Sequence, residues 1–185
     1  MLKLGYAILL GLVGAGIVHI VVLLLLPQIS ERDSWSRLGE VAGLYIPVAA
    51  DGSDQLSPVI EAPDPQFRAI ACRFDLDDGP LRVQASGSVP FWSTSIYNRS
   101  GQNIYNFNDR TAEGGRLDFV VVTPAQMIEM RKELPAELAS SVFVEADIGE
   151  GMVVVRSFVP DASWVKTIAT YLKSVSCAAV DTGQG

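Results

Sequence analysis

The sequence has a single histidine, His19, and it lies in an uncharged stretch close to the N-terminus. The rest of the chain therefore cannot form a Ser-His-Asp triad, a Cys-His dyad or a zinc site with histidine ligands. The sequence also lacks a Walker loop and a G-x-G-x-x-G motif, the common phosphate-binding loops. From these absences we expect no catalytic residue of a familiar type, no metal site and no cofactor.

Basic residues are also few, because 14 Lys and Arg stand against 21 Asp and Glu and give a formal net charge of −7. The basic residues form no cluster along the chain. An acidic protein of this kind repels phosphate backbones, so we expect no nucleic-acid partner.

Only two cysteines are present, Cys72 and Cys177. In the cytosol they would be two buried thiols, whereas outside the cytoplasm an isolated pair indicates one disulfide. The bond would join a strand early in the domain to the last predicted helix. In the chain-entropy model, closing a loop of ~100 residues stabilises a fold by ~4.7 kcal/mol.

The uncharged stretch, residues 5–26, is the longest feature of the sequence. As a helix it would span ~33 Å, enough to cross a ~30 Å hydrocarbon core. It exceeds the ~7–15 apolar residues of a signal peptide, and no A-x-A cleavage site follows it. We predict that residues 1–27 are an uncleaved signal anchor. Lys3 places the N-terminus in the cytoplasm and the C-terminal domain in the periplasm, with the anchor in the inner membrane.

One ridge of this helix carries Ala7, Gly11, Ala15 and His19 at intervals of four residues. Small residues let two membrane helices approach closely, and an ionisable residue in an apolar span is costly without a partner. We therefore predict that this ridge contacts another membrane helix. The alternative is that the imidazole bonds to its own helix or reaches the headgroups.

Beyond the anchor we predict a juxtamembrane segment and linker at 28–65, one domain at 66–178 and a flexible tail at 179–185. The domain alternates short β segments with turns, and two helices come late in the chain. The first helix begins at a capping box of Thr123, Pro124 and Gln126, and the second follows Asp161. This order predicts an α+β fold, an antiparallel sheet or a sandwich, behind a single N-terminal transmembrane helix. The predicted strands are 67–74, 81–89, 91–97, 103–107, 117–122, 141–146 and 152–158.

The segment Phe91–Arg110 is rich in aromatic and amide side chains. Alternation along its first strand puts Trp92, Thr94 and Ile96 on one face, opposite Ser93, Ser95 and Tyr97. Such a surface suits sugars, peptides or a partner's strand, unless the hairpin's polar groups merely satisfy turns and edges. The predicted binding residues are Trp92, Ser93, Tyr97, Asn98, Asn106 and Arg110.

Carboxylates are the remaining candidates for catalysis. Glu145, Asp147 and Glu150 form one acidic cluster, and a hydrolase would need two of them facing across a cleft. Asp75, Asp77 and Asp78 form another, which does not match the spacing of a calcium loop. We predict no catalytic residue from either cluster.

The motif of Phe91-Trp92-Ser93, Ile96-Tyr97, a glycine turn and Asn106 with Arg110 resembles that of two paired bacterial families of unknown function, 1254 and 1214. The short membrane-anchored form of alphaproteobacteria is the most similar, and the resemblance covers residues 66–177. It implies a periplasmic β-rich α+β domain. It also implies that the protein is the product of one gene of a pair and associates with the product of the other. It implies no established activity.

Together these features predict an envelope protein that contacts the bilayer through residues 5–26. We expect a non-enzymatic interaction module that has no catalytic site and binds another membrane protein. The first alternative is a periplasmic glycan- or peptide-binding domain that uses the Phe91–Arg110 hairpin. The second is a carboxylate-based hydrolase.

Overall fold

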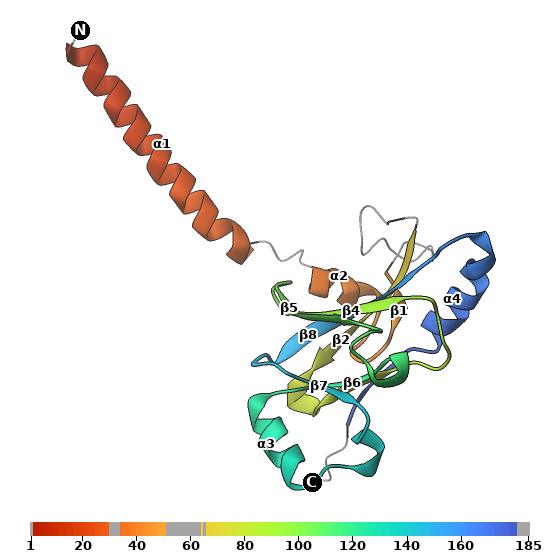
Figure 1. Ribbon diagram of the computed structural model, residues 1–185. Coiled ribbons are helices and arrows are strands. Elements are labelled where there is room, and N and C mark those ends of the chain that lie inside the picture. The colour runs from red at the N-terminus through yellow and green to blue at the C-terminus, as the bar shows by residue number, and fades with distance from the viewer. Residues whose placement is uncertain (1, 30–33, 51–63, 65, 181–185) are drawn as a thin grey trace. The chain divides into compact units, whose positions relative to one another are not determined.

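The computed structural model describes residues 2–29, 34–50, 64 and 66–180. The chain divides into two compact units, Met1–Asp33 and Ser34–Gly185. The first unit is the helix α1 (Leu2–Ile29), and the second contains both β-sheets (Figure 1). Because the two units are separate, each is described by itself.

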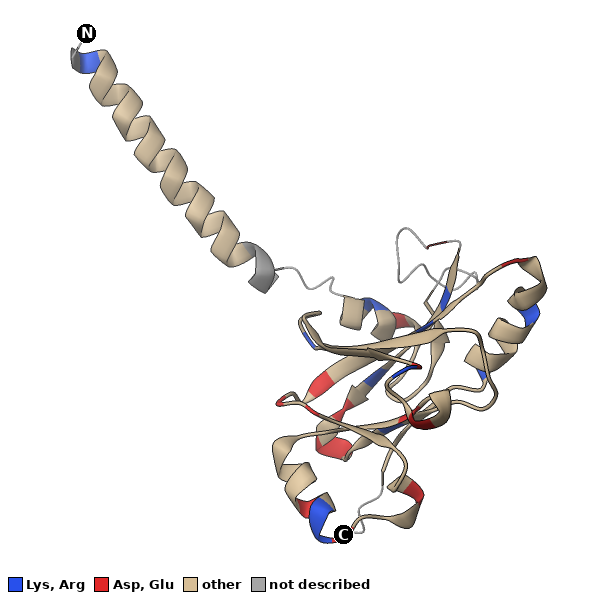
Figure 2. Ribbon diagram, in the orientation of Figure 1, with Lys and Arg blue, Asp and Glu red and all other residues tan. Residues whose placement is uncertain are grey.

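Helix α1 contains a stretch, Lys3–Leu25, that is long and apolar enough to cross a membrane. Within the part of the chain that the structure describes, it is the only helix with this property. The sequence of α1 has no charged residue after Lys3, and Figure 2 colours the helix tan beyond that residue up to its grey end. All side chains described on α1 are exposed, including the predicted ridge of Ala7, Gly11, Ala15 and His19. Membrane anchors and N-terminal signal sequences share these properties.

The second unit consists of two sheets that pack face to face. Sheet A is antiparallel, with strand order β1-β2-β8-β4-β5, and sheet B has the order β7-β6-β3-β9. In sheet B only the β6–β7 pair is parallel. The strands of sheet A are β1 (Val48–Ala49), β2 (Phe67–Asp75), β8 (Glu150–Phe158), β4 (Trp92–Asn98) and β5 (Asn103–Asn108). Those of sheet B are β7 (Val142–Glu145), β6 (Asp118–Val122), β3 (Leu81–Gln84) and β9 (Ser176–Ala179).

Three helices cover these sheets: α2 (Ser34–Val41), α3 (Pro124–Lys132) and α4 (Val165–Lys173). Leu38 of α2 is fully buried against β2 and β8 on the outer face of sheet A. Helix α3 covers the outer face of sheet B, and α4 inserts its apolar side into the core between the sheets. Four short 3-10 turns complete the fold: η1 (Leu76–Asp78), η2 (Glu113–Gly115), η3 (Ala136–Leu138) and η4 (Ala162–Trp164).

The main core lies between the two sheets, because alternate side chains of each strand point inward. Phe107 of β5 and Phe119 of β6 meet edge to face across it, with ring centroids 5.0 Å apart. Cys72 of β2 and Cys177 of β9 form a disulfide, so a covalent bond links sheet A to sheet B.

The structure confirms the α+β fold with one long apolar N-terminal helix, a β-rich domain and two late helices. It also confirms the capping box at the start of α3. The side chain of Thr123 accepts from the backbone N–H of Gln126, and the side chain of Gln126 accepts from the backbone N–H of Thr123. Cys177 corrects one prediction: it lies on β9 rather than on the last helix, because α4 ends at Lys173 and a further strand follows.

The folded unit extends further toward the N-terminus than the sequence predicted. Helix α2 and strand β1 lie within the predicted linker, and both pack on sheet A. The rest of that linker, at 51–63 and 65, lies outside the described residues, as do residues 181–185 of the predicted tail. The strand predicted at 81–89 ends at Gln84.

Candidate functional site

The outer face of sheet A has two halves with different character. Helix α2 covers one half, where Trp35 and Leu38 pack over alanines of β2 and over Met152 and Val154 of β8. The other half, formed by β4, β5 and the end of β8, presents polar side chains. We call this second half the polar face, and it comprises Ser93, Ser95, Tyr97, Asn103, Asn106 and Arg156.

Strand register brings these side chains together. Ser93 lies directly opposite Arg156 of β8, and Ser95 lies opposite Asn106 of β5. Their neighbours along β4 point into the core, so these positions point outward by alternation. Asn106 is exposed, Ser93 and Arg156 are half-buried, and the small Ser95 is buried beneath its neighbours.

Tyr97 and Arg156 form the centre of the polar face. A guanidinium nitrogen of Arg156 donates to the phenol oxygen of Tyr97 over 3.5 Å, a long contact. Burial raises the pKa of Tyr97, but hydrogen bonds with Arg156, Ser95 and Asn103 outweigh it and bring the pKa below its ordinary value. Among the described residues, no carboxylate forms an ion pair with Arg156.

Two amides border this pair on the edge strand. Asn103 and Asn106 hydrogen-bond each other twice, with each nitrogen 2.8 Å from the other side chain's oxygen. Both residues are exposed. Their mutual bonds hold the two amides in fixed orientations, while the Asn106 amide keeps a second N–H and a second lone pair for a ligand.

The predicted binding residues divide into two groups. Ser93, Tyr97 and Asn106 meet on the polar face, whereas Trp92 points into the core. The Trp92 side chain is 1% exposed and its indole N–H donates to the carbonyl of Gly115 over 2.8 Å. Alternation along β4 had separated these two groups correctly.

The other two predicted residues lie at the last position of β4 and past the end of β5. Asn98 shapes the β4–β5 turn, where its side-chain oxygen accepts from the backbone of Gln102 and from Ser100. Arg110 is exposed past the end of β5. Sequence reasoning missed Arg156, which is 59 residues from Tyr97. The sequence did contain a signal for Arg156, because it is a charged residue in the otherwise apolar strand 152–158.

Trp35 lies at the boundary between the half of sheet A covered by α2 and the polar face. The guanidinium carbons of Arg73 and Arg99 lie 4.3 Å and 3.9 Å from the centre of its ring, and its indole N–H donates to Gly151. Burial and the charge of Arg99 lower the pKa of Arg73. These cation–π contacts fix α2 on sheet A beside the polar face.

The acidic clusters serve local structure. Asp75 accepts from the backbone of Asp77 at the start of η1, and Asp78 accepts from the hydroxyl of Tyr45. Glu145 and Asp147 are exposed, and Glu150 pairs with Arg99 at 3.3 Å. In the described part of the chain, no three His, Cys, Asp or Glu side chains are grouped to hold a metal ion.

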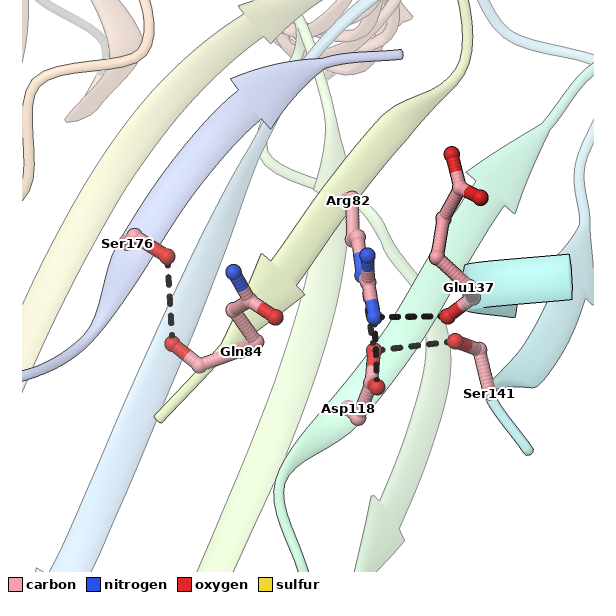
Figure 3. A network of polar contacts seen from close by, with 6 residues as sticks. All are labelled: Arg82, Gln84, Asp118, Glu137, Ser141 and Ser176. Atoms are coloured by element: carbon pink, nitrogen blue, oxygen red, sulfur yellow. Dashed lines mark hydrogen bonds and ion pairs between the residues drawn. The ribbon is translucent and has the colours of Figure 1, made fainter. Parts of the chain in front are cut away.

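A separate polar network lies on the outer face of sheet B (Figure 3). Arg82 of β3 donates twice to the carboxylate of Asp118 on β6, at 3.1 Å and 2.8 Å, and once to the carbonyl of Glu137. Ser141 donates to the same carboxylate. The network therefore ties β3 to β6 and to the segment 137–141 that precedes β7.

Comparison with known proteins matches residues 49–179 to the family described as a protein of unknown function, DUF1254. No curated protein matches the sequence. The VPA0106 protein from Vibrio parahaemolyticus is similar in structure, with a TM-score of 0.53 and 13% identity over 65% of this chain and 29% of its own. An uncharacterized protein from Burkholderia cenocepacia gives a TM-score of 0.48 and 14% identity over 82% of this chain and 41% of its own. The chain thus spans less than half the length of either protein.

Proposed function

Because the chain belongs to the DUF1254 family, whose description names no activity, we propose from the site itself that it binds a partner protein. In this proposal α1 anchors the chain in the inner membrane, and the two-sheet domain is a non-enzymatic interaction module in the periplasm. The partner is a second, related membrane protein.

The observation that carries the proposal is the polar face. A half-buried arginine lies there without a carboxylate among the described residues, beside a tyrosine and two oriented amides. Arginine and tyrosine are enriched among the residues that dominate protein–protein binding energies. Among the residues that the structure describes, no histidine, thiol or group of metal ligands accompanies them, so the arrangement favours recognition over catalysis.

Two further features support the compartment and the anchor. The Cys72–Cys177 disulfide persists only where the environment is oxidising, as in the periplasm. Lys3 lies at the N-terminal end of α1, which favours a cytoplasmic N-terminus by the positive-inside rule. The small-residue ridge that ends at His19 supplies a second contact surface, for a helix of the partner.

The test is a pull-down of the full-length chain from its own host in mild detergent, with mass spectrometry of the bound proteins. We expect one stoichiometric membrane protein whose recovery falls when His19→Leu or a polar-face substitution is introduced. Exposed Lys166→Gln on α4 is the matched control and leaves recovery unchanged. Recovery of the chain alone, at expression levels near the natural one, contradicts the proposal.

A second candidate is a periplasmic glycan or peptide ligand on the β4–β5 hairpin, favoured by the oriented Asn103–Asn106 amides. A ligand at ~100 times its dissociation constant stabilises a protein by ~2.7 kcal/mol. Thermal unfolding of the full-length chain in nanodiscs, with and without cell-wall fragments, therefore detects such a ligand. An increase in melting temperature that Asn106→Ala abolishes supports this candidate.

A further inference from the structure

We propose that the polar face binds an acidic segment of the partner protein, with a carboxylate of that segment seated on Arg156 between Ser93 and Tyr97. The inference rests on the proposed function and names the surface and the chemistry through which it acts.

The charge of Arg156 is poorly satisfied by the described residues around it. Its side chain is half-buried, and its one side-chain hydrogen bond among the described residues is the 3.5 Å contact to the phenol of Tyr97. A guanidinium has five N–H donors in a planar fork that fits a carboxylate with two parallel bonds. A partner's carboxylate supplies what the described part of this chain does not.

Other arginines of the domain show the contrast. Arg82 makes two bonds to Asp118, and Arg99 pairs with Glu150 at 3.3 Å. Arg110 is exposed past the end of β5, where its charge is accessible to water. Arg156 has lost part of its water through burial and gains no carboxylate among the described residues in exchange. Partial desolvation makes a new ion pair more favourable there than at an exposed position.

The neighbours of Arg156 suit a protein segment lying along the sheet. Directly across the strands it faces Ala69 on β2, which is buried in the cluster under α2, and Ser93 on β4, which is half-buried and has a small side chain. Tyr97 adds an amphipathic ring that packs beside the apolar cluster under α2. Asn103 and Asn106 then offer hydrogen bonds to peptide groups.

The surface is also prepared in advance. Antiparallel pairing of β4 with both β5 and β8 fixes the backbone, and the Trp35 stack fixes the neighbouring α2. Little backbone conformational entropy is lost when such a surface binds, because its strands are already paired. Complementary charge further selects an acidic partner segment and excludes a basic one.

The experiment is site-specific photo-crosslinking in living host cells, with a photoreactive amino acid in place of Asn106 in the full-length chain. Exposed Glu129 on α3 is the control position. We expect Asn106 to crosslink to a partner peptide that contains Asp or Glu, and Glu129 not to do so. Arg156→Gln should reduce the yield by about tenfold or more, whereas Arg131→Gln, an exposed arginine on α3, leaves it unchanged.

A charge exchange completes the test. Arg156→Glu should abolish the crosslink, and replacing the identified partner acid by Arg should restore it. Arg156→Lys keeps the charge but loses the fork and should retain an intermediate yield. The melting temperature of each variant in nanodiscs is measured as well, to show that the variant is folded. Tyr97→Phe is a second variant, which removes the hydroxyl next to Arg156 but keeps the ring.

Three results would overturn the inference: a crosslinked peptide without an acidic residue, a crosslink to a second copy of this chain, or an unchanged yield in folded Arg156→Gln. These outcomes are separable from failure of the proposed function. If the partner is still recovered in the pull-down and depends on His19 alone, the interaction module stands and the polar face is not its interface.

Discussion

Cys72 and Cys177 are bonded to each other across the core, and their Cα atoms lie 6.8 Å apart. Cys72 belongs to β2 of sheet A and Cys177 to β9 of sheet B, so the bond connects the sheets directly. The two residues are separated by 105 positions in the sequence. The bond therefore constrains most of the domain in its unfolded state.

Removing this bond should lower the free energy of unfolding by about 2–5 kcal/mol, because the unfolded chain regains the entropy of an open loop. The measurement is denaturant unfolding of the intact chain in detergent, with and without reductant. The Cys72→Ser/Cys177→Ser double variant is the control, and reductant should not change its stability. Equal midpoints for the oxidised and reduced wild type would contradict the prediction.

Gly151 should tolerate no side chain. A Cβ there would lie 2.5 Å from the ring of Phe74 and 2.6 Å from the backbone oxygen of Tyr97, so Gly151→Ala forces the strands apart. We expect a loss of about 1–3 kcal/mol or more in the free energy of unfolding. Gly149→Ala is the matched control, since a Cβ there meets no atom within 4 Å. Similar unfolding midpoints for the two variants would show that β8 can shift.

The Arg82–Asp118 pair should contribute measurably to stability. The two side chains are only 21% and 23% exposed, and they make two parallel hydrogen bonds. A double-mutant cycle of Arg82→Gln and Asp118→Asn should give a coupling energy of about 1–3 kcal/mol.

The control for that cycle is the exposed Glu129–Lys132 pair on α3, whose side chains are 51% and 65% exposed. A helix-surface pair of this kind contributes only about 0.2–0.5 kcal/mol. If both cycles return the same coupling, burial of the Arg82 pair is not the source of its strength.

Tyr45 should make stability depend on alkaline pH. Burial raises the pKa of Tyr45, a hydrogen bond to the backbone of Asp75 lowers it and Asp78 raises it, so that the pKa moves from 10.0 to about 12. Because the folded pKa exceeds the unfolded one, the protonated phenol stabilises the fold fully below pH 10 and less as pH rises toward 12.

Denaturant unfolding between pH 9 and pH 12 should therefore show a falling stability that Tyr45→Phe makes shallower. Part of the slope should remain, since burial and the charge of Asp109 also raise the pKa of Tyr171. A slope identical in wild type and Tyr45→Phe would mean that the Tyr45 phenol titrates equally in both states.

The ridge of α1 should face a partner helix. Photoreactive substitutions at Gly11 and Ala15 should crosslink a second membrane protein more strongly than those at Val13 and Val21, which lie off the ridge. His19→Leu should weaken the crosslinks at Gly11. Equal yields at all four positions would show that α1 only anchors the chain.

Local signals in the sequence predicted most of the elements. The Thr123–Gln126 capping box is confirmed because it needs only neighbouring residues, and the strand beginning at Phe67 follows from its apolar run. Strand β9 was missed because Ser176–Ala179 is too short to show a period, and it forms only through pairing with distant β3. Strand β1 has just two residues and was missed for the same reason.

The site was predictable in part. Alternation separated Trp92 from Ser93 and Tyr97, but it does not indicate which face meets the core, since that depends on what packs above the sheet. Arg156 joins Tyr97 only through the β4–β8 register, which the sequence does not reveal. The polar face therefore emerges from pairing between strands that are far apart along the chain.

The order of strands has a consequence for biosynthesis. Strand β8 pairs with both β2 and β4 at the centre of sheet A, so this sheet cannot form until β8 has been synthesised. Likewise, one edge of β3 stays unpaired until β9 has been synthesised. During elongation Cys72 is a free thiol awaiting a partner 105 residues later. An incompletely made chain can therefore form mixed disulfides with other proteins and exchange strands with them. The yield of folded protein thus depends on how soon β8 and β9 reach their partner strands.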